Sequence, residues 1–207
     1  MEFMDIFKKW APEYDATVSG ENEEYRDVFI NYSEMLNELA STAEGKVLEI
    51  GAGTGNLTLM LKDKGNEVSA IDPSEDMRAV ANETKHLNVQ YGHFFDIPFD
   101  ESFNYIVTSF AFHHVKPEEK AGAIQNMMNA LTADGKLLIL DTMFESEKYK
   151  QDLINYYNNK EYFNLTEDLQ TEYYTYIEDL KAIVKDLNLN LDMVQKNKFA
   201  WLATISK

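Results

Sequence analysis

Short apolar runs alternate with amphipathic stretches through the middle of the chain. Lys46–Ile50 is apolar, and Asn56–Lys64 follows it with apolar residues at helical spacing and Gly65 as a C-terminal cap. The same alternation predicts strands at Glu67–Asp72, Asn88–Phe95, Tyr105–Phe110 and Lys136–Asp141, and helices from Ser74 to about Lys85 and from Pro117 to about Leu131. Asp134-Gly135 reads as the turn before the last of these strands. This order predicts an α/β fold, a mostly parallel sheet with helices on both faces.

Two segments of different character flank this core. Residues 1–44 look helical, and so do residues 145–188, which hold seven of the twelve tyrosines. Leu191–Val194 and Phe199–Ile205 read as two strands that can close the sheet as a hairpin. We therefore expect a single domain over 1–207, with an N-terminal helical segment (1–44), a ligand-binding core (45–144), a helical insert or lid (145–188) and a closing hairpin (189–207).

Composition narrows the class of protein. The chain has 207 residues, 44% of them hydrophobic, which is enough to bury one sizeable core. No apolar run approaches the roughly 18 residues of a membrane span. The N-terminus lacks the apolar centre of a secretory signal. The sequence contains no cysteine, so disulfides and zinc–thiolate sites are excluded. We expect a cytoplasmic protein with no membrane partner.

Charge adds a constraint on the partner. The formal net charge is −17, from 36 acidic and 19 basic residues, and Arg26 and Arg78 are the only arginines. Such a surface repels phosphate backbones, so we expect a small-molecule partner and no nucleic acid. The sequence leaves the oligomeric state open.

The exit of the first strand carries the main chemical motif. Gly51, Gly53 and Gly55 stand at alternate positions, where they permit positive φ and close approach of the backbone to a ligand. The next helix presents free N–H groups, which suit a carboxylate. Glu49, two residues before the first glycine, is a candidate acceptor for a ligand amine or for neighbouring N–H groups. In a parallel sheet ligands bind at the carboxyl ends of the strands, where this loop lies.

The rival interpretation is a nicotinamide dinucleotide site. Its G-x-G-x-x-G spacing requires a glycine at position 56, where this chain has Asn56, so the count disfavours a dehydrogenase. Asp72 ends the second strand and can accept hydrogen bonds from both hydroxyls of a ribose, which supports an adenosine-type ligand under either reading. Asp96 follows the third strand and is a candidate acceptor for an exocyclic amine, with Phe95 or Ile97 against a purine face.

Taken together, several motifs resemble class I S-adenosylmethionine-dependent methyltransferases, in particular the bacterial YrrT type. They are Glu49–Gly55, Ala70–Ser74 with Met77, Phe95–Pro98, Ser109–His114, the leader Phe7–Asp15, Asp141–Phe144 and Glu172–Tyr174. The likeness runs over about residues 3 to 205. It implies a Rossmann-like sheet of seven strands whose last strand is antiparallel and inserted by a hairpin. It also implies S-adenosyl-L-methionine as cofactor, with the glycine loop at its methionine part, Asp72 at its ribose and Asp96 at its adenine.

The acceptor side of the reaction is less specified. His113 and His114 follow the fourth strand and should face the ligand crevice, where one can act as a base or orient the acceptor; the other interpretation is a packed or backbone-bonded histidine. Tyr14 is a candidate cover for the cofactor, and the tyrosines of 145–188, above all Tyr173-Tyr174, for the acceptor pocket. We expect no metal site, because the adjacent histidines lack the i, i+4 spacing of helical ligand pairs.

Two function classes follow. The first is an enzyme that methylates a small molecule at N, O or S. The second is a non-catalytic module that senses S-adenosylmethionine or S-adenosylhomocysteine, since the glycine motif supports binding in both cases.

Overall fold

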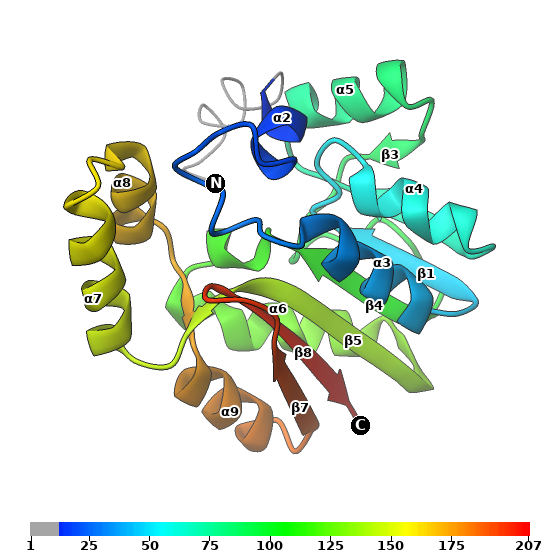
Figure 1. Ribbon diagram of the computed structural model, residues 1–207. Coiled ribbons are helices and arrows are strands. Elements are labelled where there is room, and N and C mark those ends of the chain that lie inside the picture. The colour runs from blue at the N-terminus through cyan, green and yellow to red at the C-terminus, as the bar shows by residue number, and fades with distance from the viewer. Residues whose placement is uncertain (1–12) are drawn as a thin grey trace.

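A computed structural model describes residues 13–207 (Figure 1). Its strands are β1 (Lys46–Ile50), β2 (Glu67–Ile71), β3 (Val89–Gln90), β4 (Phe103–Ser109), β5 (Leu131–Phe144), β6 (Thr175–Tyr176), β7 (Asn190–Gln195) and β8 (Ala200–Ser206). Its helices are α2 (Tyr14–Val18), α3 (Tyr32–Thr42), α4 (Asn56–Asp63), α5 (Glu75–Thr84), α6 (Lys120–Asn129), α7 (Glu147–Asn158), α8 (Phe163–Thr171) and α9 (Ile177–Asp186), with 3₁₀ turns η1 (Phe112–His114) and η2 (Pro117–Glu119).

The strands form one mixed sheet in the order β3-β2-β1-β4-β5-β8-β7. Neighbouring strands from β3 to β5 are parallel, and β8 lies antiparallel between β5 and β7. This confirms the mostly parallel sheet and the hairpin that inserts the last strand. The carboxyl ends of β1, β2 and β4 therefore meet at one edge of the sheet, where a ligand is expected.

Helices cover both faces of the central strands. Successive residues of a strand point to opposite sides, so each central strand contributes side chains to two packed layers. On β1, Val47 packs with α3 and α4, whereas Leu48 and Ile50 pack with α6 and α9. β5 repeats the pattern with Leu138 and Leu140 against the first pair of helices. The near-continuous apolar runs of the sequence thus correspond to strands covered on both sides.

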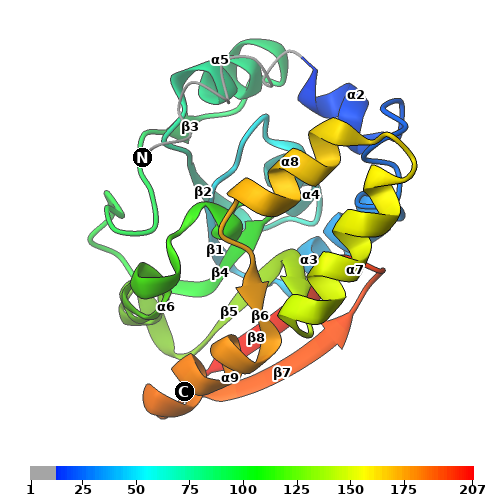
Figure 2. The same cartoon turned by 90° about the vertical axis from the view of Figure 1, so that its left-hand side faces the viewer.

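Helices α7 and α8 pack against each other outside the sheet, on the side where β5 ends (Figures 1 and 2). Phe144 at the end of β5 and Phe199 before β8 join a buried cluster with residues of both helices and with Tyr25 and Val28. We call α7 and α8 the cap. The cap lies next to the edge of the sheet that carries the glycine loop. Among residues 13–207, no helix is long and apolar enough to cross a membrane.

The structure corrects four expectations. The third strand is only Val89–Gln90, because the chain bends at Tyr91 and closes a tight loop between His93 and Asp96. β5 begins at Leu131 rather than at residue 136, and the predicted turn at 134–135 is a bulge within it. Residues 145–188 include the short strand β6, which pairs with β5.

The fourth correction concerns the N-terminal segment. Residues 19–31 form turns and bends rather than a helix, while residues 1–12, with the leader motif up to Pro12, lie outside the described part.

Candidate active site

The glycine loop has the predicted backbone. Gly51, Gly53 and Gly55 have φ of 75°, 54° and 86°, and Gly55 is the N-cap of α4. Gly51 and Gly53 line a cavity of about 530 Å³ at the carboxyl ends of β1, β2 and β4. Gly55 instead packs against Leu87, since a Cβ there would stand 2.3 Å from that side chain. Two of the three glycines therefore face the cavity and the third allows the helix to start.

Gly51 and Gly53 offer a matched pair of substitutions. A Cβ at Gly51 would stand 2.5 Å from Cβ of Ala111, whereas one at Gly53 would meet no atom within 4 Å. We expect Gly53→Ala to cost about 1–2 kcal/mol of unfolding free energy, which is the cost of positive φ in an L-residue. Gly51→Ala should cost more, because the turn after β4 must also move. Urea denaturation of the two variants measures the difference, and equal losses would contradict the close approach to Ala111.

Asp72 is held at the cavity wall directly after β2. Its Oδ2 accepts from the N–H of Gly53 and its Oδ1 from the N–H of Ser74, both at 2.8 Å. Burial raises the pKa of Asp72 to about 6, although these two hydrogen bonds favour the charged form. One lone pair on each oxygen stays available, and the side chain lines the cavity. This geometry suits a ligand with two adjacent hydroxyls.

Glu49 occupies a different place from the one predicted. It is fully buried and accepts a hydrogen bond from the hydroxyl of Thr58 on α4, and it does not line the described cavity. The strand alternation turns Ile50 toward the cavity and Glu49 beneath the loop. Burial, with a contribution from nearby Asp72, raises the pKa of Glu49 to about 8. The carboxyl is therefore uncharged at neutral pH, and its hydrogen bond with Thr58 joins β1 to α4 beneath the glycine loop.

The loop after β3 supplies the far wall of the cavity. His93, Phe94 and Phe95 line it, whereas Asp96 is exposed beside them and outside the lining. The role of Asp96 at an adenine stays a prediction. Phe95 keeps 47% of its surface exposed, which leaves its ring free to lie against a flat ligand. His93 received no role from the sequence, and its position three residues after a short strand was the available signal.

Helix α2 covers the cavity from the N-terminal side. Tyr14 lines the cavity, and burial raises the pKa of its phenol well above 10, so it is a neutral hydrogen-bonding group. The next residue, Asp15, accepts from the hydroxyl of Thr54 at 2.7 Å and pairs at 2.8 Å with Lys85, directly after α5. These contacts fasten α2 to the glycine loop. Tyr14 thus lies at the cavity, and its role as a cover for the cofactor stays a prediction.

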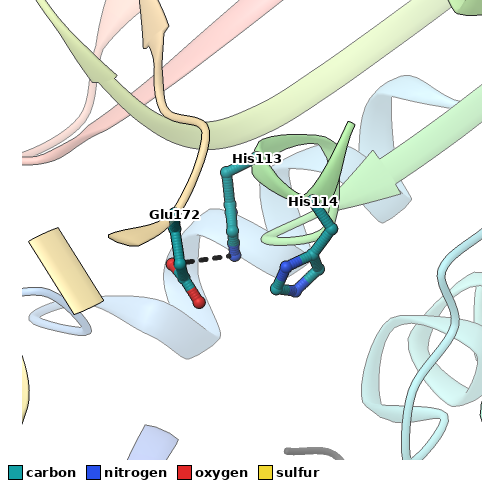
Figure 3. A group of neighbouring side chains, drawn as sticks. All are labelled: His113, His114 and Glu172. Atoms are coloured by element: carbon teal, nitrogen blue, oxygen red, sulfur yellow. Dashed lines mark ion pairs between the residues drawn. The ribbon is translucent and has the colours of Figure 1, made fainter. Parts of the chain in front are cut away.

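His113 and His114 lie together in η1, after β4 (Figure 3). Nδ1 of His113 is 2.6 Å from Oδ1 of the buried Asp141, and the Nε2 atom is 3.5 Å from Oε2 of Glu172. Burial lowers the pKa of His113, but the two carboxylates outweigh it and raise the pKa to about 9. Burial, with contributions from the nearby charges of His113 and Lys120, holds the pKa of His114 well below 6.5. The neighbouring imidazoles are therefore one charged and one neutral group at pH 7.

A second, smaller cavity of about 100 Å³ lies between this turn and the cap. It shares Tyr14, Met77, Phe110 and His114 with the large cavity. The tyrosine pair divides between the two spaces, since Tyr173 lines the large cavity and Tyr174 the small one.

The other cap tyrosines serve mainly in packing. Tyr157 is fully buried and donates a hydrogen bond to Asp27, and Tyr162 donates to Glu23. These contacts fix the cap on the segment before α3.

Long-range contacts bring in two groups that the sequence analysis names only as parts of motifs, without a role. Asp141 is one of them, and its place near the end of a parallel strand was the available signal. Glu172 lies 58 positions beyond His114, and potential ligand atoms of Glu172, His113 and His114 all lie within 4.8 Å of one another. Spacing within the histidine pair alone does not reveal this cluster, because Glu172 comes from a distant segment.

The fold and site define a class of protein, the methyltransferases. The family model described as a methyltransferase domain matches residues 47–135, which include the glycine loop and Asp72. The magnesium protoporphyrin IX methyltransferase of Synechocystis PCC 6803, solved with bound S-adenosylhomocysteine, is similar in fold, with a TM-score of 0.73 and 13% identity over 98% of this chain and 96% of that one. The chain thus has the fold of S-adenosylmethionine-dependent methyltransferases.

Sequence relatives show the family. A protein of Staphylococcus carnosus with the name "Uncharacterized methyltransferase" is 87% identical over the whole of both chains. The "Uncharacterized methyltransferase YrrT" of Halobacillus halophilus is 39% identical over 100% of this chain and 98% of its own. The chain belongs to this family of methyltransferases and is an enzyme rather than only a binding module.

Proposed function

We propose that this enzyme transfers the methyl group of S-adenosyl-L-methionine to a nitrogen, oxygen or sulfur atom of a small molecule. Asp72 is the observation that carries the proposal, because its buried carboxylate is held by two N–H groups and still offers two lone pairs to the cavity. A ribose with adjacent hydroxyls satisfies both lone pairs. The methionine part then lies along Gly51 and Gly53, and the adenine lies near Phe95 and Asp96.

The acceptor is proposed to occupy the second cavity. This space joins the cofactor cavity at Tyr14, Phe110 and His114, so a molecule within it can meet the methyl group. Its volume of about 100 Å³ favours a compact acceptor or the reactive end of a longer one. The net charge of −17 supports a small molecule over a nucleic acid.

Methyl transfer from a sulfonium requires few catalytic groups from the protein. A lone pair of the acceptor forms the bond to the methyl carbon as the carbon–sulfur bond breaks, and that electron pair stays on sulfur as the sulfonium charge disappears. No acid is needed at the leaving group, so positioning and desolvation provide most of the acceleration. An acceptor that is protonated at neutral pH must lose its proton.

His114 is the candidate to receive that proton. It lines both cavities, and its low pKa keeps a neutral imidazole at the junction. His113 is a positioning residue: its ring is held between Asp141 and Glu172 and packs against the ring of His114.

The test is incubation of the full chain with labelled S-adenosylmethionine and a pool of cell metabolites, followed by identification of the labelled product. Transfer of label to a small molecule is the expected result. Tight binding of S-adenosylhomocysteine with no transfer to any metabolite would contradict a small-molecule acceptor. Saturable NADH binding without S-adenosylhomocysteine binding would contradict the proposed cofactor.

With the acceptor in hand, His114→Asn should lower kcat by about 10²- to 10⁴-fold, the usual contribution of a positioned proton acceptor. The affinity for S-adenosylhomocysteine should change little. His86→Asn is the matched control, because His86 is exposed after α5 and lines neither of these cavities. An unchanged kcat in His114→Asn would remove this residue from the proton transfer.

A further inference from the structure

The cluster of His113, His114 and Glu172 contains the donor set of a transition-metal site. Two imidazole nitrogens and one carboxylate oxygen lie within 4.8 Å of one another, and Nε2 of His113 is 3.5 Å from Oε2 of Glu172 (Figure 3). Metal–ligand distances of about 2.0–2.2 Å place neighbouring ligand atoms roughly 3–3.5 Å apart, so small side-chain rotations suffice to close the set. This donor set suits Zn²⁺ and similar first-row ions better than Mg²⁺ or Ca²⁺.

The buried carboxylate of Asp141 orients His113 as a potential metal ligand. Its Oδ1 atom faces Nδ1 of His113 at 2.6 Å, and its Oδ2 accepts from the backbone N–H of the same residue at 2.9 Å. Nδ1–H is directed to Asp141, so a bound ion would replace the second proton of the charged imidazole, at Nε2 on the side of Glu172. A carboxylate behind a histidine ligand is the usual outer-shell arrangement of protein metal sites, where it fixes the tautomer and the ring orientation.

Glu172 is held beside the histidines by its own neighbours. The backbone N–H of Tyr173 donates to the carbonyl oxygen of His113 at 3.1 Å, which ties the end of α8 to η1. The ring of Tyr174 lies beside the His113 ring, with ring centres 5.3 Å apart, and the nearby Glu172 carboxylate helps burial to raise the pKa of its phenol well above 10. The three potential ligands are thus positioned from the protein side, although they come from segments far apart in the sequence.

The opposite side of the cluster opens on the second cavity. All three residues line it, together with Asp168, and its described lining contains two carboxylates but no lysine or arginine. The surroundings therefore favour a cation, and free coordination positions on that cation would face the space proposed for the acceptor.

We propose that His113, His114 and Glu172 bind one divalent first-row transition-metal ion, with Zn²⁺ as the probe. The metal site itself does not depend on the methyl donor. Its role in catalysis rests on the proposed function: in the metal-bound form the ion would hold the acceptor heteroatom beside the methyl group and acidify it, so that the acceptor releases its proton to water while the His114 lone pair coordinates the ion.

The test uses the full chain, freed of metal by a chelator and of any affinity tag. Calorimetric titration with Zn²⁺ should give one site per chain, and Co²⁺ should produce the visible absorption of an ion with nitrogen ligands. His114→Gln and Glu172→Gln should each remove this site. Asp141→Asn should weaken it by about 10- to 100-fold, as loss of an outer-shell partner does.

His86→Asn and Glu167→Gln are the matched controls, because both residues are exposed and lie outside the cluster, Glu167 on the same helix that leads to Glu172. Each should bind Zn²⁺ like the parent. S-adenosylhomocysteine affinity, measured separately, shows that each variant is folded and tests the proposed cofactor on its own. Absence of stoichiometric Zn²⁺ binding by the parent, or binding that His114→Gln and Glu172→Gln leave unchanged, would overturn the metal site whatever the cofactor result.

Discussion

Replacing Asp72 with alanine should weaken binding of S-adenosylhomocysteine by about 2–4 kcal/mol, or roughly 30- to 1000-fold, as measured by calorimetry. The substitution removes two charge-assisted hydrogen bonds to the ribose hydroxyls, in a site where burial limits replacement by water. It also frees the N–H groups of Gly53 and Ser74, which now donate to the carboxylate, so the glycine loop loses an anchor.

Glu75→Ala is the matched control, since Glu75 is an exposed acid in the first turn of α5, three positions further along. It removes the same charge from the same region and should leave the affinity near that of the parent. If Asp72→Ala also binds normally, the ribose lies elsewhere in the cavity.

The pH dependence of binding provides an independent check on Asp72. The pKa of its carboxyl in the free protein is raised to about 6, chiefly by burial. The ionised form accepts the hydroxyl hydrogens, so affinity should be full above pH 6 and fall as pH drops below it, by at most tenfold per unit. Asp72→Asn should bind more weakly and lose this dependence. A parent affinity that stays constant from pH 7 to pH 5 would contradict the assignment.

Glu49→Gln should stabilise the free protein at neutral and alkaline pH. The folded-state pKa of Glu49 is raised to about 8, mainly by burial, against an ordinary value of 4.5. Below pH 4.5 the carboxyl is protonated in both states and has no effect on stability. As pH rises from 4.5 to 8 the unfolded chain ionises while the folded one holds its proton, so unfolding becomes easier, by up to about 5 kcal/mol at 1.36 kcal/mol per unit.

Glutamine keeps the shape and can still accept from the Thr58 hydroxyl, but it carries no charge in either state. Denaturation at a series of pH values should therefore show a gap between variant and parent that opens above pH 4.5 and levels off near pH 8. Glu83→Gln, on the exposed side of α5, should show no such gap. S-adenosylhomocysteine affinity should survive in Glu49→Gln, because this side chain does not line the cavity. Strong loss of affinity would instead indicate that Glu49 contacts the ligand.

Much of the core was predictable because its determinants are local. The apolar runs of β1 and β2, the Ser74 cap of α5 and the glycine spacing each depend on neighbouring residues, and all are confirmed. The Ser74 hydroxyl accepts from the N–H of Met77, as an N-cap should. Asp72 was placed correctly because the carboxyl ends of parallel strands converge at one edge.

The errors arose where tertiary contacts override a local pattern. Asn88–Phe95 reads as a strand, but the chain bends at Tyr91, and Gly92 then lies so close to Ile71 and Pro98 that a Cβ there would crowd them. Glu49 was assigned to the ligand because it precedes the glycines, yet the twofold repeat of β1 turns it away. After the cap, β6 interrupts a helical pattern because it finds a partner in β5.

The sequence by itself determined the α/β architecture, the glycine loop and Asp72, because these depend on periodicity, backbone freedom and the geometry of parallel sheets. Only the tertiary structure decided the acceptor side. It brought Asp141 and Glu172 to the histidine pair, gave neighbouring imidazoles opposite pKa shifts, and joined two cavities at His114. Such an arrangement depends on contacts between residues up to 59 positions apart (172 − 113), and their distances and burial cannot be read from spacing along the chain.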